Sequence, residues 1–135
     1  MRKIAMMVGA LALGVAVVAQ AASPAQVVEA RQKNLKAMGK AMKETGDSFK
    51  SGNPDAALIK ANAAILAGNA GKIETWFPAG TAMGGAIKTT AKPEIWTDKA
   101  GFAKAASDFS VAVKAYKVAA DSGDLAATGK ALGAL

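Results

Sequence analysis

Apolar residues recur every three or four positions in four stretches of the sequence, which is the spacing of helices that bury one face. The stretches span residues 24–51, 54–76, 98–121 and 124–135. No stretch shows the alternation of apolar and polar residues that is typical of a half-buried β-strand. Short connections join the first helix to the second and the third to the fourth, and this favours antiparallel neighbours. We therefore predict an all-α fold, an antiparallel up-down four-helix bundle.

Local signals support the ends of these helices. Ser23 and Gln26 have the spacing of a capping box, and Pro24 fits the first helical position. Pro78 ends the second helix, because the residue before a proline is pushed out of the helical backbone region. The fourth helix is the exception, since residues 124–135 are too few to cover the three longer helices. We predict an incomplete fourth helix, which leaves apolar surface uncovered near one end of the bundle.

The N-terminus has the three parts of a secretory signal peptide. A basic pair is followed by an apolar run, and Ala19-Gln20-Ala21 supplies the small residues that a signal peptidase reads. The apolar run is short for a membrane-spanning helix, which needs about 20 residues, and a retained membrane anchor is the alternative. We predict a signal peptide over residues 1–21, a mature domain over residues 22–135, a periplasmic location and no stable membrane anchor.

The composition excludes several classes of function. The sequence contains no cysteine and no histidine, which rules out disulfides, most arrangements of catalytic nucleophile and base, and nearly all transition-metal sites. It has 17 basic against 10 acidic residues and a net charge of +7. An exported chain whose aromatic residues occupy apolar-stripe positions does not have the pattern of a nucleic-acid-binding protein. We predict no enzyme activity and no nucleic-acid partner.

Arg31 stands on the first helix at a position where the pattern calls for an apolar side chain. A guanidinium that faces the interior of a bundle needs an anionic partner, because an unpaired buried charge is costly. Two interpretations stay open. Either the stem of the side chain packs while its charged end extends to the edge of the helix, or the guanidinium meets a bound carboxylate.

Two further groups of residues have both a functional and a purely structural interpretation. Trp76 and Trp96 lie at helix ends, where they either cap the core or form the walls of a pocket for a flat ligand. A lysine strip on the first helix is either a solvated face or a docking surface for an acidic partner or an anionic membrane. The lysine strip consists of Lys33, Lys36, Lys40 and Lys43.

Four motifs follow one another along the chain. They are Arg31-Gln32, Trp76-Phe77-Pro78-Ala79-Gly80, the segment Ala91-Lys92-Pro93-Glu94-Ile95-Trp96-Thr97-Asp98 before Phe102, and Ser122-Gly123-Asp124-Leu125. Their order resembles the cytochrome c prime family, the class II c-type cytochromes. In that family the last helix carries Cys-x-x-Cys-His, which holds haem c by two thioether bonds and supplies the proximal iron ligand. This sequence reaches Leu135 without that motif, so we expect it to be truncated, and covalent attachment to these 135 residues is impossible.

The resemblance implies non-covalent haem contacts for four residues. Arg31 matches the family arginine near the haem propionates, and Leu35 matches the position that faces the open side of the iron. A leucine there implies a five-coordinate haem that is accessible to gases, whereas low-spin relatives have methionine. Trp96 and Phe102 are the remaining pocket candidates.

The resemblance thus predicts a periplasmic haem-binding protein for electron transfer or the binding of a small gas ligand. It also implies a homodimer and an acidic redox partner. The alternative is a haemless helical-bundle protein that binds a partner through the half-open end of the bundle or the lysine strip. If residues 22–135 are the whole mature protein, we expect it to bind haem weakly or not at all.

Overall fold

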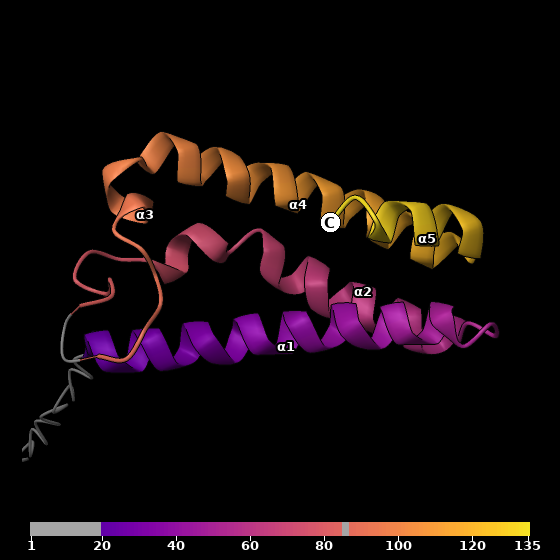
Figure 1. The fold of residues 1–135 in the computed structure, drawn as a ribbon, viewed down its shortest axis with the longest axis horizontal. Coiled ribbons are helices and arrows are strands. Elements are labelled where there is room, and N and C mark those ends of the chain that lie inside the picture. The colour runs from indigo at the N-terminus through magenta and orange to yellow at the C-terminus, as the bar shows by residue number, and fades with distance from the viewer. Residues whose placement is uncertain (1–19, 85–86) are drawn as a thin grey trace, which may run out of the picture.

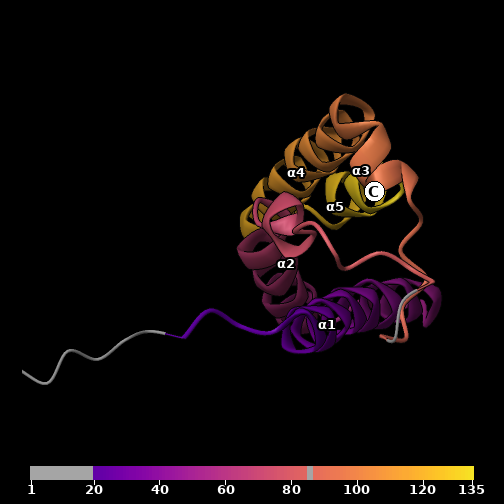
Figure 2. The same ribbon diagram turned by 90° about the vertical axis from the view of Figure 1, so that its left-hand side faces the viewer.

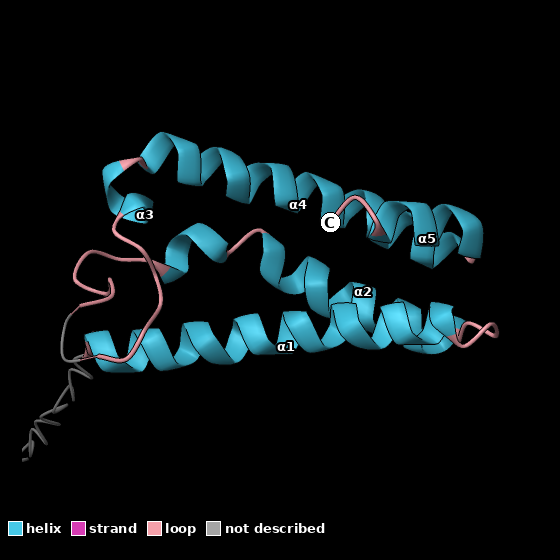
Figure 3. Cartoon of the chain, in the orientation of Figure 1, coloured by secondary structure: helices cyan, strands magenta, loops and turns pink. Residues whose placement is uncertain are grey.

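The computed structural model describes residues 20–84 and 87–135 as a set of helices without any strand (Figure 3). The predicted signal peptide therefore lies almost entirely outside the described residues. The helices are α1 (Pro24–Lys50), α2 (Ala56–Ala70), the 3-10 helix η1 (Ile73–Trp76), α3 (Glu94–Thr97), α4 (Lys99–Ser122) and α5 (Leu125–Leu132). The all-α prediction is confirmed. Within the described ranges, no helix combines the length and the hydropathy that crossing a membrane requires.

Helices α1, α2, α4 and α5 run in alternating directions along the long axis of the bundle (Figure 1). Helix α2 packs along both α1 and α4, and α5 packs mainly against α4. The end-on view in Figure 2 accordingly places α2 between α1 and α4. Because α2 contacts both long helices, its apolar residues form the centre of the core.

Helix α5 covers only part of the bundle. It turns back from α4 at Gly123, whose φ of +77° lies in the left-handed region that glycine adopts easily. The chain then ends about midway along α4 (Figure 1). At the other end of the bundle, the connection that follows residue 87 runs from the N-terminal part of α1 to α3 (Figure 1). Helix α5 thus covers one end of the bundle, and the connection before α3 covers the other end (Figure 1).

The sequence pattern of α1 explains both its start and its buried face. Ser23 Oγ accepts a hydrogen bond from the Gln26 backbone N–H at 3.3 Å, and Gln26 Oε1 accepts one from the Ser23 N–H at 2.8 Å. This is the predicted capping box. The two positions at which the apolar stripe is interrupted hold Arg31 and Thr45, and both side chains are buried. The interruptions of the stripe therefore mark polar groups inside the fold.

The structure divides the predicted helix over residues 54–76 into two parts. Helix α2 ends at Ala70, a turn follows, and η1 continues to Trp76. Gly68, Asn69 and Gly71 cluster at the break, and all three are poor helix formers. The break redirects the chain so that Phe77 and the connection after it can cross the end of the bundle.

A small polar junction joins the three longest helices inside the core. Tyr116 of α4 donates its hydroxyl hydrogen to Thr45 Oγ1 of α1 at 3.4 Å. Asn62 of α2 donates from Nδ2 to the same oxygen at 3.3 Å. All three side chains are buried, and burial raises the pKa of Tyr116. Because buried polar groups must find partners, this junction fixes the register of α1, α2 and α4 relative to one another.

Candidate functional site

The guanidinium of Arg31 is held inside the fold by neutral oxygen atoms. Nη1 donates to Trp76 O at 3.3 Å and to Thr81 Oγ1 at 3.1 Å. Nη2 donates to Thr81 O at 3.0 Å and to Thr89 Oγ1 at 2.9 Å. The guanidinium carbon also lies 4.4 Å from the centre of the Phe77 ring, a distance typical of a cation–π contact. We call these interactions the Arg31 clasp.

The Arg31 clasp decides between the two interpretations of this residue. The side chain is only 2% exposed, so the interpretation in which the charged end extends to the helix edge is wrong. None of the ion pairs among the described residues includes Arg31. The guanidinium of Arg31 can be buried because oxygens of Trp76 in η1 and of Thr81 and Thr89 in the connection accept its hydrogen bonds. The second interpretation, a bound carboxylate, stays a prediction.

Thr81 and Thr89 are site residues that the sequence analysis missed. Thr81 Oγ1 donates to Pro78 O at 2.8 Å while it accepts from Arg31. Thr89 Oγ1 accepts both from Arg31 and from the backbone N–H of Ala91 at 3.2 Å. Both threonines lie in the connection between Phe77 and α3, where no helical spacing applies. The sequence pattern gave no signal for either residue, and only the length of the connection, above the usual limit of about 12–15 residues, sets it apart.

A groove of about 470 Å³ lies beside the Arg31 clasp, within the usual size range of small-molecule sites. We call it the Arg31 groove. Helix α1 lines it with Arg31, Gln32 and Leu35, and Phe77 and residues 89–92, 94 and 95 complete its walls. Leu35 is 41% exposed although it belongs to the apolar stripe. The groove therefore brings together two of the four predicted site residues.

Trp96 and Phe102 lie beside a second, smaller hollow. The Trp96 indole donates from Nε1 to Phe77 O at 2.9 Å and to Pro78 O at 3.1 Å. The Phe102 ring meets the Phe77 ring edge to face, with centres 5.0 Å apart. The hollow of about 180 Å³ is lined by both residues, and Phe77 and Ile95 line it as well as the Arg31 groove. Phe77 and Ile95 thus separate the two pairs of predicted site residues, and Phe77 was not among the four residues to which the resemblance gave a haem contact.

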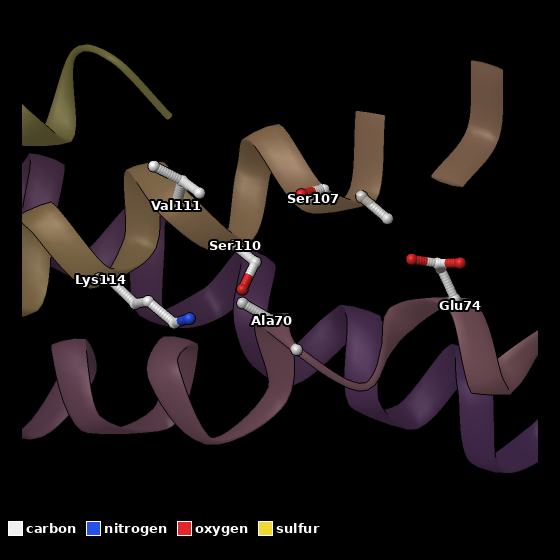
Figure 4. A pocket seen from close by; sticks show the side chains of 8 residues that line it. Ala70, Glu74, Ser107, Ser110, Val111 and Lys114 are labelled. Atoms are coloured by element: carbon white, nitrogen blue, oxygen red, sulfur yellow. The ribbon is translucent and has the colours of Figure 1, made fainter. Parts of the chain in front are cut away.

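A third hollow lies between the end of α2 and α4 and contains none of the predicted site residues. Figure 4 shows Glu74, Ser107, Ser110 and Lys114 around this crevice of about 210 Å³. The small side chain of Ala70 and the break in the helix after it leave the space open. The polar side chains in its lining distinguish this hollow from the more apolar Arg31 groove.

The lysine strip is partly neutralised within α1. Lys40 Nζ lies 2.7 Å from Glu44 Oε1, and Lys43 pairs with Asp47. These lysines hold the pKa values of Glu44 and Asp47 below their usual range. Lys33 and Lys36 take part in no ion pair among the described residues. The strip is therefore cationic mainly in its first half, and an acidic partner stays a prediction.

Together, these features describe a helical-bundle protein with an apolar groove next to a buried cation. Residues 26–135 match the family model for cytochrome c′, and the chain belongs to the cytochrome c′ family. It is 40% identical to the cytochrome c′ of Rhodospirillum rubrum over 135 residues, which cover 96% of this chain and 88% of the relative. The resemblance predicted from the motifs is confirmed.

Solved structures agree with this assignment. A cytochrome c′ with an unusual ligand-controlled dimer dissociation superposes with a TM-score of 0.79 at 27% identity, covering 85% of this chain and 88% of that chain. A mutant of cytochrome c prime from Alcaligenes xylosoxidans in complex with nitric oxide has a TM-score of 0.73 at 31% identity, covering 85% and 88%. The four-helix bundle of the family is thus the fold of this chain.

The family binds haem c, and the residues of this chain fit that group only in part. The Arg31 groove offers apolar walls and a buried cation, which suit the non-covalent contacts of a flat apolar group with acidic substituents. The donor set does not fit, because none of the 135 residues is a cysteine or a histidine. No described residue can therefore form a thioether bond to haem or supply an imidazole to its iron.

Replacing Arg31 with glutamine tests whether the clasp holds the connection in place. We expect Arg31→Gln to lower the free energy of unfolding by about 2 kcal/mol, because a glutamine cannot meet the four oxygens that the guanidinium reaches. In hydrogen exchange, the Met83 amide, which bonds to Ala91 O at 2.8 Å, should exchange faster than in the wild type.

The matched control is Lys36→Gln, which removes an exposed cation from the same helix. Its effect on unfolding in urea should be about 0.5 kcal/mol or less. An Arg31→Gln protein with unchanged exchange at Met83 would show that the connection is held by other contacts.

Proposed function

We propose that this chain is a periplasmic haem-binding protein that transfers electrons or binds a small gas ligand. The observation that carries the proposal is the buried, cationic Arg31 beside an apolar groove, in a chain of the cytochrome c′ family. Arg31 and Leu35 are the proposed non-covalent contacts of the haem, and Trp96 and Phe102 are proposed to support the wall of its pocket. When bound, the haem would supply an iron centre that changes oxidation state or takes up a gas molecule.

Each proposed contact follows from the position of its side chain. Arg31 lines the groove and attracts an acidic substituent by its charge. Leu35 presents an apolar surface without a ligand atom, which leaves space on that side for a small gas molecule. Trp96 and Phe102 contact the far side of Phe77, so they keep the groove wall in place rather than lining the groove. The gas-binding function is favoured by Leu35, and one relative of this fold is a nitric oxide complex.

Isolating the protein from its native periplasm tests the haem function directly. We expect haem absorbance that persists after denaturation, and an intact mass above that of residues 22–135, because the family holds haem c covalently through a Cys-x-x-Cys-His motif that these 135 residues lack. A colourless protein with the mass of residues 22–135 would contradict the proposal and favour a haemless interaction protein on this scaffold.

The role of Leu35 is tested in the haem-containing protein by Leu35→Met. A methionine thioether is an axial ligand of haem iron in other cytochromes, so we expect a change to a six-coordinate, low-spin absorption spectrum and slower binding of nitric oxide. Leu35→Ile keeps an apolar side chain and should leave the spectrum unchanged. Identical spectra for the wild type, Leu35→Met and Leu35→Ile would show that Leu35 lies away from the iron.

We propose that the protein forms a homodimer through the outer face of α2. Ala57, Ala61, Ala64 and Ile65 are exposed on that helix, and small side chains allow two helices to approach closely. One structural relative is described by its dimer dissociation. We expect a dimer by light scattering, and a shift to monomer in Ile65→Lys. The control Val118→Lys, at an exposed position of α4, should remain dimeric; a monomeric wild type would contradict the proposal.

A further inference from the structure

Four exposed lysines lie around the edge of the Arg31 groove. Lys33 and Lys36 belong to α1, and Lys88 and Lys92 belong to the connection before α3. The Gln32 side chain donates to Lys88 O at 3.0 Å, and it lines the groove together with Lys92. Gln32 also lines a neighbouring hollow together with Lys33 and Lys36. The fold thus brings two pairs of lysines that are far apart in the sequence to one surface, which we call the basic rim.

The charge of the basic rim is not balanced by the acids beside it. None of its lysines takes part in an ion pair among the described residues. Two acids, Glu29 and Glu94, share the linings of the groove and of the neighbouring hollow. Five cations stand against them when the buried Arg31 is counted. This surface therefore keeps an excess of positive charge, which attracts anionic groups over about 8 Å at physiological ionic strength.

Most other acidic residues are fixed at distant points of the fold. Four of the ten acids in the sequence form ion pairs with lysines of their own helix, α1 or α4. Three more, Asp55, Asp98 and Asp124, accept hydrogen bonds from backbone N–H groups as helix caps. Glu74 lies in the crevice that Lys114 also lines. These acids cannot neutralise the basic rim without giving up the contacts that they make in the fold.

We propose that the basic rim docks a protein partner whose contact surface is rich in carboxylates. Complementary charge speeds the encounter of two proteins and fixes their orientation. The apolar groove lies at the centre of this interface and the lysines lie at its edge, which is the usual arrangement of a protein–protein contact. A role of the partner in electron transfer rests on the proposed function, because the haem would lie in the groove that the rim borders. The docking itself rests on the lysines alone.

An anionic membrane is the other surface that clustered lysines attract. Helices that lie in a membrane interface also insert Trp, Phe or Leu side chains among the lipids. Among the described residues, no aromatic side chain belongs to the large apolar side chains that are exposed. The basic rim therefore has the charge of a membrane-binding surface without its aromatic anchors, and these observations favour a protein partner.

The test measures the binding of a poly-L-glutamate peptide, which stands in for a carboxylate-rich protein surface, to the purified, haem-free protein. We expect saturable binding that weakens with salt, and at least about tenfold weaker binding when all four rim lysines are changed to glutamine. In NMR spectra of the wild type, the amide signals of Gln32, Lys33 and Ala91 should shift as the peptide is added. Unchanged binding by the rim variant would overturn the proposal.

A control variant with the same net charge separates the basic rim from charge in general. It changes four exposed lysines outside the rim to glutamine, and we expect its affinity to stay within about twofold of the wild type. Equal losses in the rim variant and the control would overturn the proposal, because total charge would then explain the binding. The control positions are Lys50, Lys72, Lys114 and Lys130.

Phosphatidylglycerol vesicles test the membrane alternative with the same proteins. We expect weak cosedimentation that the rim variant and the control reduce equally, since both lose the same charge. Tight vesicle binding that only the rim variant loses would overturn the proposal, because a lipid surface would then be the occupant.

The result is separable from that of the proposed function. Peptide binding at the basic rim of the haem-free protein would support this inference even beside a colourless native protein, which would contradict the haem function. Covalent haem in the native protein, together with equal peptide binding by the wild type and the rim variant, would overturn this inference alone.

Discussion

The burial of the Arg31 guanidinium is the constraint on which the end of this bundle depends. A charge taken out of water needs several oxygen partners, and α1 itself cannot supply them because its own carbonyls are used within the helix. The partners come instead from Trp76, Thr81 and Thr89. One side chain therefore fixes the end of η1 and two points of the connection onto α1. The hydrogen bond from Gln32 Nε2 to Lys88 O at 3.0 Å adds a further point on the same helix.

The break after Ala70 makes this arrangement possible. A straight α2 that continued to Trp76 would carry Phe77 along the axis of the helix. The turn and η1 instead bring Phe77 under the guanidinium, where its ring also contacts Phe102. Trp96 then bonds to the carbonyls of Phe77 and Pro78. The backbone at the end of η1 is thus fixed from α1 on one side and from α3 on the other, and Phe77 is the wall between two hollows.

The sequence predicts the helices well because burial of one face imposes a regular spacing on their residues. It also identifies Arg31, since a charge in an apolar stripe needs an explanation. It does not identify Thr81 or Thr89, because the connection has no period from which a partner could be deduced. Leu35 shows a different limit. Its position in the stripe predicts burial, but α5 covers only part of the bundle (Figure 1), and the Leu35 side chain is 41% exposed and lines the groove. The break in α2 was readable in principle from three weak helix formers near residue 70, but it was outweighed by an apolar stripe that continues to Phe77.

The same physical features explain which part of a haem site these residues form. Haem combines an apolar body with carboxylates, and the Arg31 groove offers apolar walls and a cation that pairs with no acid among the described residues. Haem c additionally requires thioether sulfurs and a ligand to its iron. Those groups are absent from the 135 residues, whereas the side chains suited to non-covalent contacts are held in place by the Arg31 clasp. The non-covalent and the covalent parts of such a site are therefore separate in this fold: the first depends on α1 and the connection after Phe77, and the second on residues beyond those that form the clasp.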